Sequence, residues 1–449
     1  MVASPPDRMG SPEGDREGRR LSIALAIYAA VTTVLWITTA RDRLQFHTPY
    51  NHFALLADAW IRGHLDLGGP PPPYTGNNDF AVFQGRYFIS FPPFPAVLLL
   101  PLVKLAGSPE RVRDGQFFLW FAGIAPAVLF LAMEKLRRAG RNPRTELQNA
   151  ALALLFAFGS VYWFSAVQGT VWFAAHVVGA ALASIYIFAS LDARHPLLAG
   201  IALGLGFATR TPLAFAFPLF VYEAIRISRR TDPPPGSTFA PRIAGADVRT
   251  LVTRLALFGI PAATVLATLL WHNAARFGDP FEFGHKLLDV AWRARMEKWG
   301  LFSYHYLGRN LAVVLTSLPF TGVADTPFQI NAHGLALWLT TPLYAWAFWP
   351  RRPGPLFAAL AVTAAAIALP SLLYQNSGWI QFGYRFSNDF APFLFLMIAL
   401  SRRRMGASFW LLAAFAVAVN AFGAVTFQRS GYERFYFTDR TQKILHQPD

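Results

Sequence analysis

The side chains that could do chemistry gather in one stretch of this 449-residue chain, between the first apolar segment and the series of apolar segments that follows. The stretch runs from Arg41 to Gln116, and its length of about 75 residues far exceeds the few residues that usually join two elements. It carries carboxylates, imidazoles and other polar groups: Asp42, His47, Asn51, His52, Asp58, Asp79, Arg86 and Tyr87. We expect it to form one wall of a site at a membrane surface.

Polar residues also interrupt later apolar runs, and we expect them to face this wall. Arg210 separates IALGLGFAT from PLAFAFPLFVY, and His176 lies in VQGTVWFAAHVV. Tyr384, Arg385 and Asp389 open a further run in GYRFSNDFAP. Charged groups at membrane depth are costly, and they usually face a cavity and serve function.

Each of these residues also has a purely structural interpretation. Arg210 could snorkel at the tip of a helical hairpin. Arg385 and Asp389 are one helical turn apart and could form an ion pair. His176 could be a packed, hydrogen-bonded residue. The acids of the first loop could simply be solvated.

Together, these residue types suggest cations that bind a phosphate and acids that act on a hydroxyl. The chain has no cysteine, which excludes disulfides and thiolate metal sites. No metal motif, nucleotide-binding glycine loop or Ser/His/Asp signature stands out. We therefore predict no cofactor, and a divalent metal ion is left open.

The composition is that of a polytopic membrane protein. Apolar residues make up 54% of the chain and charged residues only 14%, against about 25% charged in soluble domains. The mean hydropathy is +0.33. The net charge of +15 comes from basic residues in short loops between apolar runs. This is the positive-inside pattern, which explains the charge without a nucleic-acid partner.

The charge rule predicts an all-α bundle of about 11 transmembrane helices with a cytoplasmic N-terminus. Expected domains are a disordered cytosolic segment (1–20), a transmembrane domain (21–427) and a tail (428–449). Within the transmembrane domain, 41–116 and 272–331 are long extracytoplasmic loops. The expected spans are 21–40, 117–136, 148–166, 171–191, a hairpin over 196–227, 251–271, 333–349, 356–374, 386–400 and 407–427.

Two helices are expected inside the first loop. Residues 53–62 form an amphipathic pattern, with Phe53, Leu56 and Trp60 on one face and Asp58 on the other. Residues 94–106 are apolar but too few to cross a bilayer, so we expect an interfacial or re-entrant helix.

Several motifs resemble those of the GT-C superfamily of membrane glycosyltransferases, in particular protein O-mannosyltransferases and aminoarabinose transferase-like proteins. The likeness starts with a first outer loop that has a helix ending in ADAWIRG and continues as GRYFISFPPFPAVLLLP. It extends to LALGLGFATRTP, RFGDPFEFG and FGYRFSNDFAP, and so covers roughly residues 21–400.

The resemblance implies sugar transfer from a polyprenyl-phosphate-linked donor to a lipid, glycan or protein acceptor outside a bacterial-type inner (plasma) membrane. In the family, an acid of the first loop is the general base and cations hold the departing lipid phosphate. The usual Asp position reads His47-Thr48-Pro49-Tyr50 here, and Phe91 replaces the usual basic residue before the two prolines. The candidate bases are Asp58, Asp79, Asp42 and His52.

The candidate substrate-binding residues extend from the first loop to the later spans. Arg86, Arg210 and Arg385 are the expected phosphate ligands. The other members of this set are Tyr87, His176, Tyr384 and Asp389. A non-catalytic lipid-binding subunit and a transporter or flippase of a lipid-linked substrate are the alternative functions.

Overall fold

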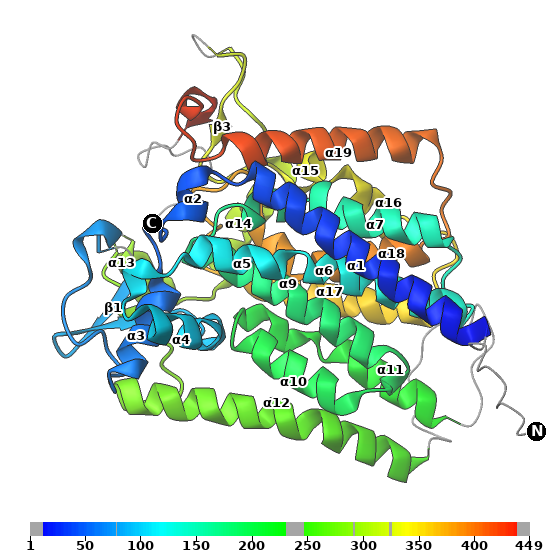
Figure 1. The fold of residues 1–449 in the computed structure, drawn as a ribbon, viewed down its shortest axis with the longest axis horizontal. Helices are drawn as coiled ribbons and strands as arrows, with labels where there is room; N and C mark the ends of the chain where they lie inside the picture. Colours follow the sequence, from blue (N-terminus) through cyan, green and yellow to red (C-terminus); the bar gives the residue numbers. More distant parts are fainter. Residues whose placement is uncertain (1–11, 78, 230–246, 291, 323–325, 438–449) are drawn as a thin grey trace, which may run out of the picture.

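Residues 12–77, 79–229, 247–290, 292–322 and 326–437 are described by a computed structural model. Its helices run side by side along the long direction of the molecule, and the elements of the first loop cover one end of this bundle (Figure 1). Helix α1 (Pro12–Thr38) begins at the opposite end. Residues 12–20, expected to be disordered, therefore extend the first helix, while 1–11 lie outside the described residues.

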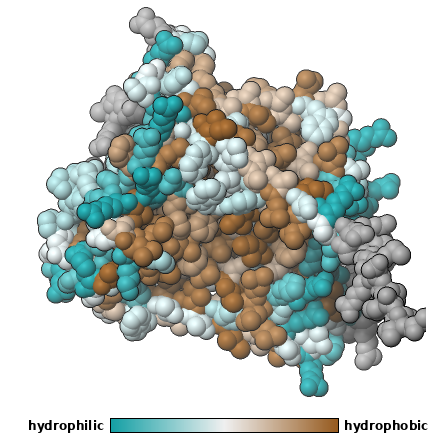
Figure 2. All heavy atoms as spheres, viewed as in Figure 1, coloured by the Kyte–Doolittle hydropathy of each residue, from teal (hydrophilic) through white to brown (hydrophobic). Residues whose placement is uncertain are grey.

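In the described part of the chain, six helices are long and apolar enough to cross a membrane. They are Glu17–Thr38 of α1, Asp114–Arg138 (α5, Asp114–Ala122, with α6, Ile124–Arg138), Val171–Ala193 (α9, Val171–Ser190, with η3, Leu191–Ala193), α12 (Val248–Phe277), α17 (Pro355–Leu373) and α19 (Ala407–Thr426). Apolar side chains cover the middle of the molecule and hydrophilic ones its two ends (Figure 2). The chain is thus a multi-pass membrane protein.

Shorter or broken helices complete the bundle. They are α7 (Glu146–Phe158), α8 (Tyr162–Ala166), α10 (Pro196–Phe207), η4 (Thr211–Ala216), α11 (Pro218–Ser228), α15 (Leu337–Thr340), η7 (Pro342–Tyr344), α16 (Ala345–Phe348), η8 (Arg385–Asp389) and α18 (Ala391–Leu400). The expected hairpin over 196–227 is present as α10, η4 and α11. The expected span over 333–349 is instead three short pieces, so the number of about 11 crossings stays a prediction.

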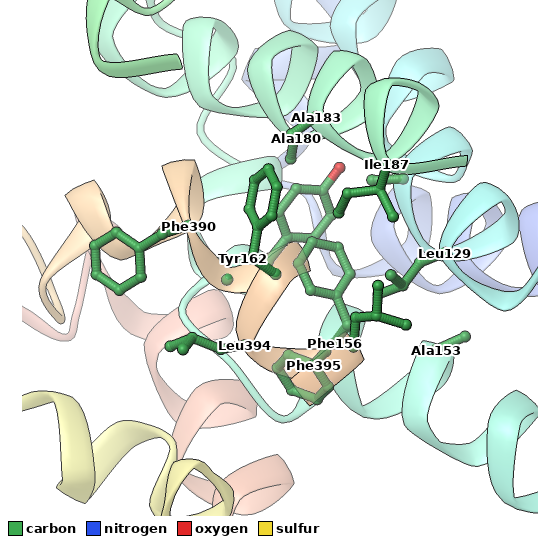
Figure 3. Packing of buried hydrophobic residues seen from close by; sticks show 14 of the residues in the cluster. Leu129, Ala153, Phe156, Tyr162, Ala180, Ala183, Ile187, Phe390, Leu394 and Phe395 are labelled. Atoms are coloured by element: carbon green, nitrogen blue, oxygen red, sulfur yellow. The ribbon is translucent and has the colours of Figure 1, made fainter. Parts of the chain in front are cut away.

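The centre of the bundle is a large buried cluster of apolar side chains from α6, α7, α9 and α18. Phe156 packs against Phe395 with ring centroids 5.6 Å apart, and against Tyr162 at 4.8 Å (Figure 3). The Tyr162 hydroxyl donates to the carbonyl of Ala122 at 2.9 Å, which satisfies its polar atom inside this core.

Two helices approach each other unusually closely at a glycine. A Cβ atom on Gly200 of α10 would lie 2.0 Å from the carbonyl oxygen of Phe258 on α12. Only a residue without a side chain allows this backbone-to-backbone contact, as in other membrane helix pairs.

The first loop folds into short elements. They are α2 (Arg41–Gln45), α3 (His52–Ile61), η1 (Pro73–Thr75), β1 (Phe80–Phe83), β2 (Arg86–Ile89), α4 (Phe94–Ala106) and η2 (Pro109–Arg111). Helix α4 has the predicted bounds, and α3 lies one residue from them. The antiparallel hairpin β1–β2 was not predicted. Its turn residues Gln84 and Gly85 both have positive φ, as a two-residue hairpin turn requires.

Backbone hydrogen bonds attach the first loop to the spans. The N–H of Val171 donates to the carbonyl of Tyr50 at 3.1 Å, and the N–H of Phe94 donates to the carbonyl of Ala208 at 2.9 Å. The first contact links the loop to α9, and the second links it to the end of α10. The loop is therefore a fixed part of the fold.

The second loop and the tail lie at the same end. Their elements are η5 (His285–Leu287), α13 (Arg293–Trp299), η6 (Tyr304–Tyr306), α14 (Leu307–Thr316), β3 (Ile330–Asn331), η9 (Glu433–Phe435) and β4 (Tyr436–Phe437). Strand β3 pairs in parallel with β4, which joins the tail to the second loop. Residues 438–449 of the expected tail lie outside the described residues.

Candidate functional site

Asp79 is a half-buried acid of the first loop, and Asp114, which is buried and accepts hydrogen bonds from the N–H and hydroxyl of Thr48, is a second acid that the fold carries inward. Asp79 directly precedes β1 and has a positive φ of 63°, an uncommon conformation that Asp tolerates better than most residues. The indole Nε1–H of Trp172, at the start of α9, donates to its Oδ2 at 2.8 Å. Burial raises the pKa of Asp79, and the Trp172 hydrogen bond opposes this. The positive charge of Arg385 also acts to lower the pKa of Asp79, so the two side chains interact electrostatically.

His52 packs among aromatic rings beside Asp79. It is fully buried at the start of α3, and its ring stacks on Phe80 with centroids 4.5 Å apart. The Phe91 ring meets it edge-on at 5.5 Å. Trp172 links the two candidate bases, since its ring centroid lies 6.2 Å from that of His52 and its Nε1–H donates to Asp79.

Arg385 begins η8 and is held by the loop that precedes it. Its NH1 donates to the carbonyl oxygens of Gly378 and of Trp379, the latter at 3.2 Å. The guanidinium also lies over the rings of Phe173 and Phe386, at 5.2 and 5.5 Å. Neutral groups thus position this cation and leave its charge uncompensated by a direct ion pair in the described residues.

The alternative in which Arg385 pairs with Asp389 is not what the structure has. Asp389 instead accepts a bidentate pair of bonds from Arg210, at 3.0 Å from Nε and 2.8 Å from NH2. The Nδ1 atom of His176 lies 3.1 Å from the same carboxylate. Because η8 is a 3-10 helix, the i,i+4 geometry of an α-helix does not apply to Arg385 and Asp389.

Four buried polar atoms of this cluster have no hydrogen-bond partner in the part of the chain that the structure describes. They are Nε2 of His176, the hydroxyl of Tyr384, Nε of Arg385 and Oδ1 of Asn388. Buried polar groups are nearly always paired, so such atoms indicate a place where water or a ligand binds. Tyr374 lies beside the cluster: its ring centroid is 6.4 Å from that of Phe386, over which both Arg210 and Arg385 lie.

The remaining predicted site residues lie elsewhere. Asp58 pairs with Arg62 one helical turn later, at 2.8 Å, on the outer face of α3. Arg86 has a 69% exposed side chain and lies 3.4 Å from Asp66. These residues point outward because the opposite faces of α3 and β2 bury apolar side chains.

Asp42 and Tyr87 are also separate from the cluster. Asp42 is exposed in α2, where its charge acts on Arg43 and Arg429. Tyr87 pairs with Val82 in the hairpin and packs against the apolar cluster of α3 and α4. Neither touches Asp79 or Arg385 in the structure.

Sequence reasoning missed Trp172, Phe173, Tyr374 and the loop 378–381. Trp172 precedes His176 by one helical turn, so a helical projection of 171–190 would have placed both on one face. The loop contributes backbone carbonyls, for which the sequence carries no signal. In the described residues, no three His, Asp or Glu side chains are grouped to hold a metal ion.

Comparison with known proteins is informative at the level of fold. No protein-family profile matches the sequence, and no curated protein matches it. The apo crystal structure of the oligosaccharyltransferase from Archaeoglobus fulgidus superposes with a TM-score of 0.51 at 14% identity, over 94% of this chain and 60% of that one. The chain therefore spans less than two thirds of that protein's length.

A second solved structure is ArnT from Cupriavidus metallidurans bound to undecaprenyl phosphate, with a TM-score of 0.48, 12% identity, and coverage of 88% of this chain and 63% of that one. Its score is too low to carry an argument. The superposition with a TM-score of 0.51 shows that the chain shares the fold of the archaeal oligosaccharyltransferase.

Proposed function

We propose that this protein is an integral membrane glycosyltransferase that moves a sugar from a polyprenyl-phosphate-linked donor to a hydroxyl of an acceptor. The observation that carries the proposal is that α9 brings an acid and a cation to the loop-covered end of a GT-C fold: Trp172 donates to half-buried Asp79 at 2.8 Å, and Arg385 lies over the ring of the next residue, Phe173, at 5.2 Å. A carboxylate that accepts a proton and a cation that binds a phosphate are the two groups that this reaction needs side by side.

Asp79 is the proposed general base. Its pKa is raised by burial, and a base works best when its pKa lies nearer the working pH. The hydrogen bond from Trp172 fixes the orientation of one carboxylate oxygen and leaves the other for the acceptor. Asp58 is unsuited because Arg62 already pairs with its carboxylate, and Asp42 because it is exposed. His52 packs beside Asp79 and keeps water from it.

Arg385 is the proposed ligand of the donor phosphate. The acceptor oxygen bonds to the anomeric carbon, the bond between that carbon and the phosphate oxygen breaks, and the acceptor proton passes to Asp79. The leaving phosphate gains negative charge, which Arg385 stabilises. Arg210 is a positioning residue that acts through Asp389 and His176, and Tyr384 offers a hydroxyl to the same space.

The topology follows from this site. We propose that the first and second loops form the extracytoplasmic cap of a 21–427 transmembrane domain in the inner (plasma) membrane, with the N-terminus in the cytoplasm. The basic residues at the other end of the bundle support this orientation.

The test compares two single carboxylate-to-amide variants of the same loop. Purified protein is reconstituted in proteoliposomes with a radiolabelled polyprenyl-phosphate sugar and membrane extract as acceptor source. Asp79→Asn should reduce transfer at least a hundredfold, in line with loss of a general base, while Asp58→Asn should leave it unchanged. Equal transfer by both variants would show that Asp79 is not the general base. If the unmodified protein binds the lipid but transfers no sugar, the alternative of a non-catalytic lipid-binding subunit is favoured.

A further inference from the structure

A cavity lies at the end of the bundle opposite the proposed reaction site. It has a volume of about 610 Å³ and opens where α7 begins and where α18 passes into α19. Its lining includes Arg144, Arg402, Arg403 and Arg404. Four arginines around one cavity make a strong local concentration of positive charge.

No carboxylate neutralises the three consecutive arginines within the described residues. Arg402 and Arg404 are exposed, and Arg403 donates to the carbonyl of Trp349. Glu146, the acid nearest to the cavity in the sequence of α7, is already paired with Arg19 at 2.5 Å. The cavity therefore presents cations that still lack an anion.

The fourth arginine builds the floor of the cavity. Arg144 is 6% exposed, and its guanidinium donates to the carbonyls of Ile398 and Ala399, both at 3.1 Å. These carbonyls belong to the last turn of α18, where a helix has unpaired acceptors. Arg144 thus holds the C-terminus of α18 in place, and with it the start of the run of arginines that follows.

Two helix N-termini add to the positive potential. Gln148 in the first turn of α7 and Gly406 at the start of α19 both line the cavity. No side chain caps α19 at Gly406, so its first N–H groups are available to an anion. A phosphate placed here would meet both the arginines and these backbone donors.

The surroundings are those of a membrane interface. Trp349 and Trp410 flank the arginine run and are 64% and 44% exposed, and Leu411 is 71% exposed. Exposed tryptophans at the border of an apolar band mark the headgroup level of a bilayer. A cavity at this level is open to a lipid that lies in the membrane.

We propose that this cavity binds the headgroup of an anionic phospholipid, whose acyl chains lie along the apolar surface beside α19. Basic pockets between membrane helices bind such headgroups in this way. The site is separate from the reaction site, and it would stabilise the junction between α18 and α19 only in membranes that contain anionic lipid. The inference does not depend on the glycosyltransferase proposal.

The test measures lipid binding by native mass spectrometry of the full chain in neutral detergent, titrated with phosphatidylglycerol or phosphatidylcholine. The variant Arg402→Gln/Arg404→Gln is compared with Arg138→Gln/Arg249→Gln, which removes two exposed arginines away from the cavity. Each basic residue near an anionic lipid surface contributes about 1 kcal/mol, so two should change affinity about 30-fold.

We expect the cavity variant to lose phosphatidylglycerol binding by that factor and the control to retain it, with phosphatidylcholine binding weakly to all three proteins. Equal loss in both variants would mean that only overall charge matters and would overturn the proposal. If inorganic phosphate alone displaces all of the bound phosphatidylglycerol, the ligand of the cavity is a free anion and not a lipid. Thermal unfolding in phosphatidylcholine nanodiscs should be the same for all three, which shows that each is folded.

Discussion

Replacement of Trp172 by Phe isolates the hydrogen bond that orients the proposed base. The change removes the Nε1–H that donates to Asp79 at 2.8 Å but keeps an aromatic ring against Tyr50, whose centroid lies 4.6 Å away. The bond stabilises the ionised carboxylate, so its loss moves the pKa of Asp79 further in the direction in which burial already raises it.

The sign and size of the effect follow from this bond. A base must be ionised, and a higher pKa leaves less of it ionised on the acidic side. A hydrogen bond to a charged group contributes about 1.5–3 kcal/mol, which corresponds to roughly 10- to 150-fold in the ionisation equilibrium. The acidic limb of the rate profile should therefore move to higher pH, with a loss of that order at low pH and little loss at high pH.

The assay is sugar transfer in proteoliposomes as a function of pH, with Trp120→Phe as the control. Trp120 is 51% exposed on α5 and does not contact Asp79 in the structure, so its profile should match that of the unmodified protein. A Trp172→Phe profile that falls uniformly at every pH, or moves to lower pH, would refute the role of this bond in setting the ionisation of Asp79.

Two further predictions concern stability, both read from thermal unfolding in detergent. Arg210→Met should destabilise the protein by about 3–5 kcal/mol because it leaves the buried Asp389 without its bidentate partner. The double variant Arg210→Met/Asp389→Asn should recover part of this stability. A double variant that is no more stable than Arg210→Met would contradict the role of the ion pair. Gly200→Ala should lower the unfolding temperature because its Cβ would clash with the carbonyl of Phe258. The control Gly259→Ala should be neutral, since a Cβ there meets nothing within 4 Å. Equal effects of the two changes would contradict the close approach of α10 and α12.

Much of the local structure was predictable because it follows from composition over short windows. The helix Phe94–Ala106 ends at Gly107, whose positive φ suits a residue without a side chain. The hairpin of α10 and α11 bends around Arg210 and Thr211 as its polar interruption indicated. The β1–β2 hairpin was missed although it carries a signal, since Gln84 and Gly85 separate two runs rich in aromatic residues.

The candidate site was predicted in part. Five of the predicted residues lie in one cluster: Arg210, His176, Asp389, Tyr384 and Arg385. Each interrupts an apolar run, so its polar group needs other polar groups as partners inside the bundle. Their partners were not predictable, since the pairing of Asp389 with Arg210 spans 179 positions. A helix projection alone suggested the nearer Arg385.

The sequence by itself determined that this is a multi-span membrane protein, because the cost of placing polar groups in lipid leaves long apolar runs with basic loops as the visible pattern. It also supplied the acids and arginines from which a site could be built. Only the tertiary structure decided which acid is the proposed base: Asp42, Asp58 and Asp79 are alike in the sequence, but the packing of the first loop on α9 joins half-buried Asp79 to Trp172, while Asp58 pairs with Arg62 and Asp42 is exposed. That choice depends on contacts between distant segments, and therefore on the desolvation that the fold imposes.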